Sequence, residues 1–195
     1  MAENALDQPR YLVIGGSAGS LEVILDLVPG LPTPPNAVVI IVVHRKKDND
    51  SILVSLLSSR TSLPVREVED KETIQPNTIY LAPPDYHLLI ERADLFSLDS
   101  SEKVHYSRPS IDVTFESVAE AFGHRVIGVL LSGANADGAA GIAKIQQNGG
   151  YTIVQDPSTA DVGYMPQQAL ALTPVDSVLP AGKIAGLLQK LLKIK

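Results

Sequence analysis

The chain has 195 residues, a formal net charge of −6 and no cysteine. The missing cysteine excludes disulfides, thiolate catalysis and cysteine-based metal sites, and the acidic balance argues against a nucleic-acid partner. The start of the chain lacks a signal-peptide pattern, and the longest apolar run, residues 37–43, is too short to cross a bilayer. We therefore expect one cytoplasmic domain over residues 1–195, without membrane insertion.

Short apolar runs alternate with segments of helical periodicity along the chain. The pattern predicts a strand at 11–14, a helix at 21–28, a strand at 37–43, a helix around 52–57 and strands at 65–68 and 79–82. Segments 87–91 and 95–98 predict an antiparallel hairpin. A helix at 111–122, capped by Ser110, precedes a strand at 126–131, a helix at 138–147, a strand at 151–154, a helix at 165–172, a strand at 177–179 and a helix at 184–192.

This alternation of strands and helices is typical of the α/β class. It predicts a doubly wound, mainly parallel sheet with helices on both faces and the antiparallel hairpin at the edge. The apolar runs at 37–43 and 126–131 are continuous, which indicates central strands that are covered on both faces.

The glycine-rich turn after the first strand is a candidate site. Gly15, Gly16 and Gly19 surround Ser17, and a helix follows, so backbone N–H groups and the positive helix end face whatever binds there. A serine in such a strand-to-helix turn is a candidate nucleophile. The structural alternative is that a tight turn needs small residues whatever its chemistry.

Three polar residues follow the carboxyl ends of predicted strands: Ser17, His44 and Asp137. In an open α/β sheet these ends line the ligand crevice, so the three side chains are expected to converge there. Serine, histidine and aspartate form the constellation of acyl transfer, with the imidazole as base and the carboxylate orienting it. Alone, His44 could make an ordinary hydrogen bond, and Asp137 could cap the helix that begins at Gly138. His87 is interpreted as structural.

Nucleotide or phosphate binding at the glycine turn is the main rival from another class. The segment G-G-S-A-G-S lacks the first glycine of G-x-G-x-x-G, because Ile14 occupies that position. The second strand ends in His44 rather than in an acid that could hold a ribose, and no P-loop lysine follows. These differences disfavour the nucleotide hypothesis.

Several motifs follow one another along the chain: I-G-G-S-A-G-S, V-V-H, I-Y-L-A-P-P-D-Y-H-L-L, R-P-S-I-D-V-T-F-E-S-V-A, L-S-G-A-N-A-D-G-A-A-G and V-Q-D-P-S-T-A-D-V-G-Y-M-P. Together and in this order, they resemble the catalytic domain of CheB-type chemotaxis protein-glutamate methylesterases. The resemblance implies a single methylesterase-like catalytic domain in which Ser17 is the nucleophile, His44 the base and Asp137 its orienting acid. It further implies hydrolysis of glutamyl methyl esters on the cytoplasmic helices of chemoreceptors and deamidation of selected glutamines, with no cofactor and no metal.

The chain departs from the family pattern at three places. About ten residues precede the first strand, so the family's usual receiver domain is not in this chain, and a receptor methyltransferase becomes a candidate partner. Ala134 and Asn135 replace methionine and glycine in the loop that binds the oxyanion, and Ala18 replaces a common threonine. The resemblance places Ala18, Ala134 and Asn135 at the oxyanion or substrate. The alternative function is a signalling or scaffold module of the same fold with little or no turnover.

Overall fold

The computed structural model describes residues 10–31, 37–45, 50–91 and 94–192. Its centre is a seven-stranded sheet in which every pairing is parallel. Strand β1 (Arg10–Gly16) lies between β2 (Ala37–Val43) and β7 (Val126–Leu130). Beyond β2 lie β4 (Thr78–Leu81) and β3 (Val65–Glu67), and beyond β7 lie β8 (Tyr151–Gln155) and β9 (Ser177–Leu179).

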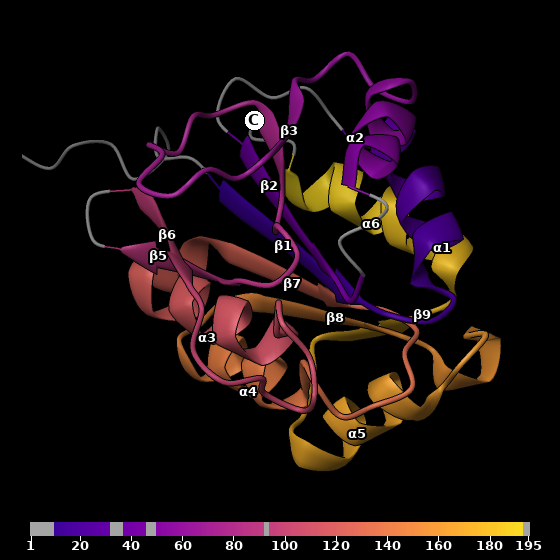
Figure 1. Cartoon of the computed structure of the whole chain (residues 1–195). Helices are drawn as coiled ribbons and strands as arrows, with labels where there is room; N and C mark the ends of the chain where they lie inside the picture. The colour runs from indigo at the N-terminus through magenta and orange to yellow at the C-terminus, as the bar shows by residue number, and fades with distance from the viewer. Residues whose placement is uncertain (1–9, 32–36, 46–49, 92–93, 193–195) are drawn as a thin grey trace, which may run out of the picture.

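Helices cover both faces of this sheet (Figure 1). One face carries α1 (Ser20–Leu27), α2 (Asp50–Ser58) and α6 (Ala181–Leu192). The other carries α3 (Ile111–Phe122), α4 (Ala139–Gln147) and α5 (Tyr164–Leu172). Each face has its own buried apolar cluster, because residues of the central strands alternate between the two sides. The predicted α/β class and doubly wound parallel sheet are confirmed.

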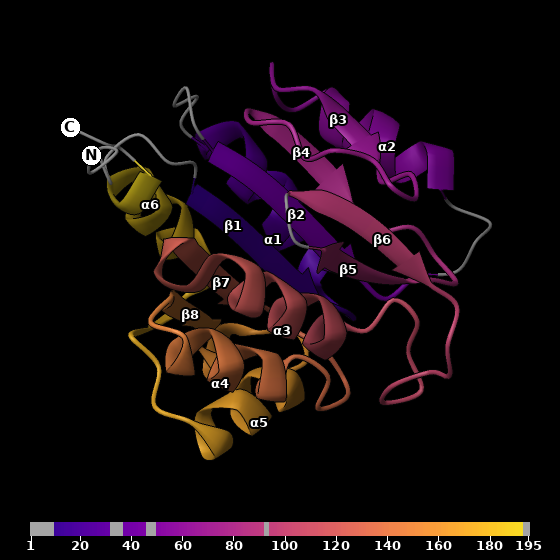
Figure 2. The same cartoon turned by 90° about the vertical axis from the view of Figure 1, so that its left-hand side faces the viewer.

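The antiparallel hairpin forms as predicted from β5 (His87–Glu91) and β6 (Leu95–Asp99). It is a separate two-stranded sheet and adds no strand to the edge of the large one. Figure 2 shows it beside α3, in the layer that covers one face of the sheet. Side chains of α3 satisfy its backbone: Thr114 Oγ1 donates to Leu88 O at 2.9 Å, and Ile90 N donates to Ser117 Oγ at 2.6 Å. These contacts replace the strand pairing that an edge position would supply.

The direction of winding reverses between β1 and β7. From β1 the chain passes first to β2 on one side and later to β7 on the other, with helices on opposite faces. Loops after adjacent strands therefore diverge at this point and leave a crevice above the carboxyl ends. None of the helices in the described part of the chain combines the length and apolar character needed to cross a bilayer.

Candidate active site

The turn after β1 holds Ser17 in a tightly packed backbone. Its amide donates to Ser132 O at 2.9 Å, and its carbonyl accepts from Ser20 Oγ at 2.7 Å. Glycine is needed on both sides of it. A Cβ on Gly16 would lie 2.4 Å from Ser20 Cβ, and Gly19 has a φ of +79°, in the left-handed region. The glycines thus serve the geometry of the turn that presents Ser17.

The turn after β7 is joined to the Ser17 turn through the buried residue Ser132. The hydroxyl of Ser132 donates to Ala18 O at 2.7 Å and accepts from Val162 N at 2.9 Å. Ala18 and Ala134 are exposed members of these two adjoining turns. Their alanine side chains are small, so a ligand above Ser17 can approach the backbone of both turns.

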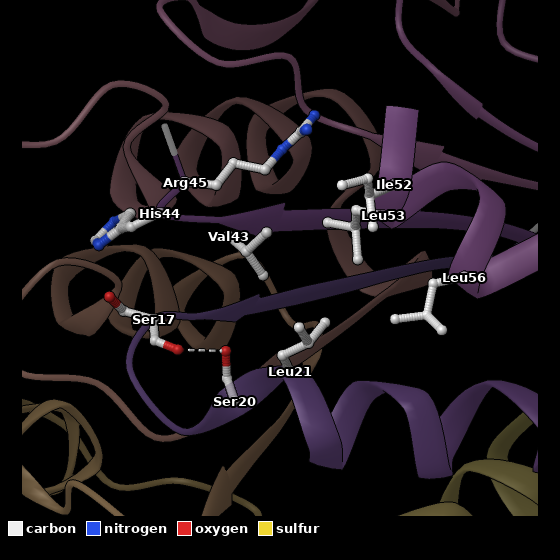
Figure 3. A pocket seen from close by; sticks show the side chains of 9 residues that line it. All are labelled: Ser17, Ser20, Leu21, Val43, His44, Arg45, Ile52, Leu53 and Leu56. Atoms are coloured by element: carbon white, nitrogen blue, oxygen red, sulfur yellow. Dashed lines mark hydrogen bonds between the residues drawn. The ribbon is translucent and has the colours of Figure 1, made fainter. Parts of the chain in front are cut away.

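His44 follows β2 and is anchored to the Ser17 turn and to the β7 loop. Its backbone amide donates to Gly16 O at 3.3 Å. Its ring Nε2 lies 2.8 Å from Asp137 Oδ2, and its Nδ1 lies 3.3 Å from the hydroxyl of Ser107. Figure 3 shows the Ser17 hydroxyl turned toward the His44 ring at the edge of a cavity. Side chains from the loops after β1, β2 and β7 therefore converge over three adjacent strands.

Asp137 is fully buried and accepts hydrogen bonds on both carboxylate oxygens. Beside His44, the donors are Ser110 Oγ at 2.7 Å, Ile111 N at 2.7 Å and Asp112 N at 2.9 Å. Burial works to raise the pKa of this carboxyl. The His44 ring and the donors at the α3 N-terminus outweigh burial and hold the pKa below its usual value. Asp137 is therefore an ionised acceptor, and its partner Nε2 carries the proton.

The alternative in which Asp137 caps the helix that begins at Gly138 is wrong, because Asp137 caps α3 instead. The N-cap of α4 is Gly138, which makes no side-chain cap bond, while Asp137 receives the first amides of α3. In return, Asp112 in the first turn of α3 accepts from Gly138 N at 2.8 Å and Gly141 N at 2.7 Å. Burial, followed by the nearby Asp137 charge, raises the pKa of Asp112 to about 6. The two carboxyls thus cap each other's helices.

Two cavities meet at His44. The first, of about 320 Å³, has an apolar wall between α1 and α2 (Figure 3) and is lined by Ser17, Ser20, Leu21, Val43, His44, Arg45, Ile52, Leu53 and Leu56. The second, of about 430 Å³, is lined by polar and charged residues: His44, Arg45, Asp85, Lys103, Tyr106, Ser107 and Arg108. Arg45 lines both cavities, and its guanidinium pairs with Glu67 and with Ala82 O.

The other singled-out residues have separate places. His87 is buried, with Nε2 2.9 Å from Glu102 O and Nδ1 accepting from Ser110 N, in agreement with a structural role. The side chain of Asn135 donates to His105 O at 3.2 Å and to Ser107 Oγ at 3.3 Å. Sequence reasoning missed Ser107, because nothing in a polar loop marks one serine among several.

Within the described residues, no group of three or more His, Cys, Asp or Glu side chains is placed to hold a metal ion. The features that remain are a serine hydroxyl, an imidazole with a buried carboxylate partner, and two exposed backbone turns. This set can perform nucleophilic acyl transfer.

Comparison with known proteins gives consistent matches over nearly the whole chain. A family model described as CheB methylesterase matches residues 12–188. The putative protein-glutamate methylesterase/protein-glutamine glutaminase of Leptospira interrogans serogroup Icterohaemorrhagiae serovar copenhageni is 44% identical over 180 residues, which cover 92% of this chain and 93% of that protein. A protein-glutamate methylesterase/protein-glutamine glutaminase of Thermotoga maritima is 34% identical, and the match covers 90% of this chain and 52% of that protein.

The structural comparison agrees with the sequence matches. The crystal structure of the Thermotoga maritima CheB methylesterase catalytic domain superposes with a TM-score of 0.89 at 34% identity. The match covers 94% of this chain and 99% of that domain.

Proposed function

Because this chain belongs to the CheB methylesterase family, we propose that it hydrolyses γ-glutamyl methyl esters through a relay of Ser17, His44 and Asp137. The observation that carries the proposal is the 2.8 Å contact between His44 Nε2 and the buried Asp137 carboxylate, beside the nucleophile turn. An ionised Asp137 keeps the proton on Nε2, so the lone pair of the neutral ring is on Nδ1 and can accept the proton of Ser17.

The reaction then proceeds in two halves. Ser17 Oγ attacks the ester carbonyl carbon while His44 takes the hydroxyl proton, and the backbone amides of Ala18 and Ala134 hold the oxyanion. The tetrahedral intermediate expels the methoxide group, which takes the proton from His44 and leaves as methanol. Water then attacks the γ-glutamyl ester on Ser17 and gives a proton to His44. His44 passes that proton to Ser17 Oγ as the acyl bond breaks, and the product leaves as the glutamate carboxylate after losing its own proton to solvent. With a glutamine substrate the leaving group is ammonia. No step needs a cofactor or a metal.

We further propose that the substrate is an amphipathic chemoreceptor helix in the cytoplasm. The apolar cavity, with its exposed residues Leu21 and Ile52, suits the apolar side of such a helix. Lys103 and Arg108, in the polar cavity beyond His44, suit neighbouring carboxylates. In this proposal the chain acts as one catalytic domain, and a receptor methyltransferase that works on the same helices is a candidate partner. Asn135 contributes by holding residues 105–107 beside the polar cavity, because its side chain donates to His105 O and to Ser107 Oγ.

The test is methanol release from a methylated cytoplasmic fragment of a receptor. Ser17→Ala is expected to lower kcat by at least about 10⁴-fold, because the nucleophile is lost. Ser59→Ala, at an exposed serine near the end of α2, is the matched control and should keep the native rate. Thermal unfolding checks that both variants are folded. A native chain that binds the fragment without releasing methanol would support the scaffold alternative instead.

A further inference from the structure

The loop of residues 100–109 passes over the edge of the candidate active site and is held by several contacts. Arg108 Nη1 donates to the carbonyls of Ser100 and Ser101, both at 2.6 Å. Two backbone hydrogen bonds join Val104 and Ser107 across a tight turn. These contacts fix the position of Ser107, the last residue of the turn, next to His44.

The turn itself has a backbone that L-residues rarely adopt. Its central residues, His105 and Tyr106, have φ angles of +47° and +61°, in the left-handed region. The ring of His105 contacts α3, with its Nε2 3.4 Å from Asp112 Oδ2, whereas Tyr106 is 97% exposed. Unfavoured backbone conformations persist where the surroundings enforce them, and they gather at functional sites. Here the enforced turn aims Ser107 at the His44 ring.

The hydroxyl of Ser107 has three polar neighbours at the same distance. It lies 3.3 Å from His44 Nδ1, 3.3 Å from His105 O and 3.3 Å from Asn135 Nδ2. Asn135 Nδ2 can only donate, so it takes one lone pair of the Ser107 oxygen. The single Ser107 proton can be given either to His44 Nδ1 or to His105 O.

This arrangement lets one hydroxyl serve both protonation states of the imidazole. With Nε2 protonated toward Asp137, the neutral ring has its lone pair on Nδ1 and can accept from Ser107. Once Nδ1 has taken a proton, it becomes a donor. Ser107 then turns its own proton to His105 O and accepts from Nδ1–H, in a charge-assisted bond that is stronger than the neutral one.

We propose that Ser107 is a positioning residue of the esterase reaction, which holds the His44 ring at Nδ1 and changes from donor to acceptor when the ring becomes charged. This inference rests on the proposed function of Ser17, His44 and Asp137. Nδ1 has one lone pair, so it cannot accept from Ser107 and Ser17 together. Ser107 therefore donates to Nδ1 in the free enzyme and gives way to the Ser17 hydroxyl as the substrate arrives. It accepts from Nδ1–H only after Ser17 has transferred its proton to the ring.

The kinetic test compares Ser107→Ala, Ser107→Thr and the control Ser100→Ala, at an exposed serine of the same loop, on the methylated receptor fragment. We expect Ser107→Ala to lower kcat about tenfold, which corresponds to about 1.4 kcal/mol, with KM within about twofold of native. Ser107→Thr keeps the hydroxyl and should stay within about threefold of the native kcat, and Ser100→Ala should match it. Equal losses in the alanine and threonine variants, or an unchanged kcat in Ser107→Ala, would overturn the proposal.

A second measurement does not depend on turnover. In the full chain with ¹⁵N-labelled histidine, the His44 Nδ1 resonance, assigned with His44→Gln, should move in Ser107→Ala and stay in Ser107→Thr. An unchanged resonance in Ser107→Ala would refute the contact itself. If the native chain releases no methanol, the proposed function fails, while this experiment still decides whether Ser107 holds the ring.

Discussion

Replacing Asp137 by asparagine tests the electrostatic centre of the site. Each carboxylate oxygen accepts two hydrogen bonds: Oδ1 from Ser110 Oγ and Asp112 N, and Oδ2 from His44 Nε2 and Ile111 N. An amide has only one acceptor oxygen. In either orientation, its NH₂ group faces a backbone N–H that has lost its acceptor.

The magnitude follows from these contacts. A buried donor without an acceptor costs about 1–3 kcal/mol, and losing a negative charge at the α3 N-terminus adds up to about 1–2 kcal/mol. We therefore expect Asp137→Asn to lower the free energy of unfolding by roughly 2–4 kcal/mol, which lowers the Tm by about 5–15 °C in a chain of this length. The catalytic loss should be about 10⁴-fold in kcat, because His44 is no longer held in the required tautomer.

Thermal unfolding followed by circular dichroism gives the Tm, and methanol release gives kcat. Because the pKa of Asp137 is lowered from 3.8, its carboxylate stabilises the fold above that pH, and the contribution is lost as pH falls through the lower folded value. The difference in stability between the native chain and Asp137→Asn should therefore become smaller in strong acid. A variant that melts within about 1 °C of the native chain and keeps kcat within about tenfold would refute the reasoning.

Two other substitutions test the surroundings of the site, and a third, in α6, is the control for one of them. The pKa of Asp112 is raised from 3.8 to about 6, so its stabilising contribution is complete below pH 3.8 and is lost as pH rises to about 6. Asp112→Asn should therefore be more stable than the native chain by roughly 1–3 kcal/mol at pH 7 and should lose that advantage at pH 4. Urea unfolding at the two pH values measures both free energies. A difference in unfolding free energy that is the same at both pH values would contradict this prediction. Gly16→Ala should destabilise by about 1–3 kcal/mol and impair methanol release, because the new Cβ would lie 2.4 Å from Ser20 Cβ. In Gly186→Ala, in α6, the new Cβ would have no heavy atom within 4 Å, so this control should stabilise the fold by about 0.5–1 kcal/mol in thermal unfolding. Equal losses of stability in both glycine variants would contradict the packing argument.

Local signals were enough to predict most elements, because their physical cause is local. The helix Ile111–Phe122 matches its prediction at both ends, since the Ser110 hydroxyl accepts from Val113 N and Gly123 supplies a φ of +54° after the last turn. The apolar run Ala37–Val43 is a fully buried central strand, as its continuous character indicates. The parallel order of strands then indicates that Ser17, His44 and Asp137 approach one edge of the sheet.

By itself, the sequence determined the elements, the α/β class, the family resemblance and the three strand-end residues, since periodicity and motif order are written along the chain. Only the tertiary structure decided which helix Asp137 caps, that the hairpin packs on α3, and that Ser107 lies 3.3 Å from His44 Nδ1. These facts depend on contacts between residues 25 to 63 positions apart, where a side chain's partner is selected by packing and burial rather than by its neighbours in sequence.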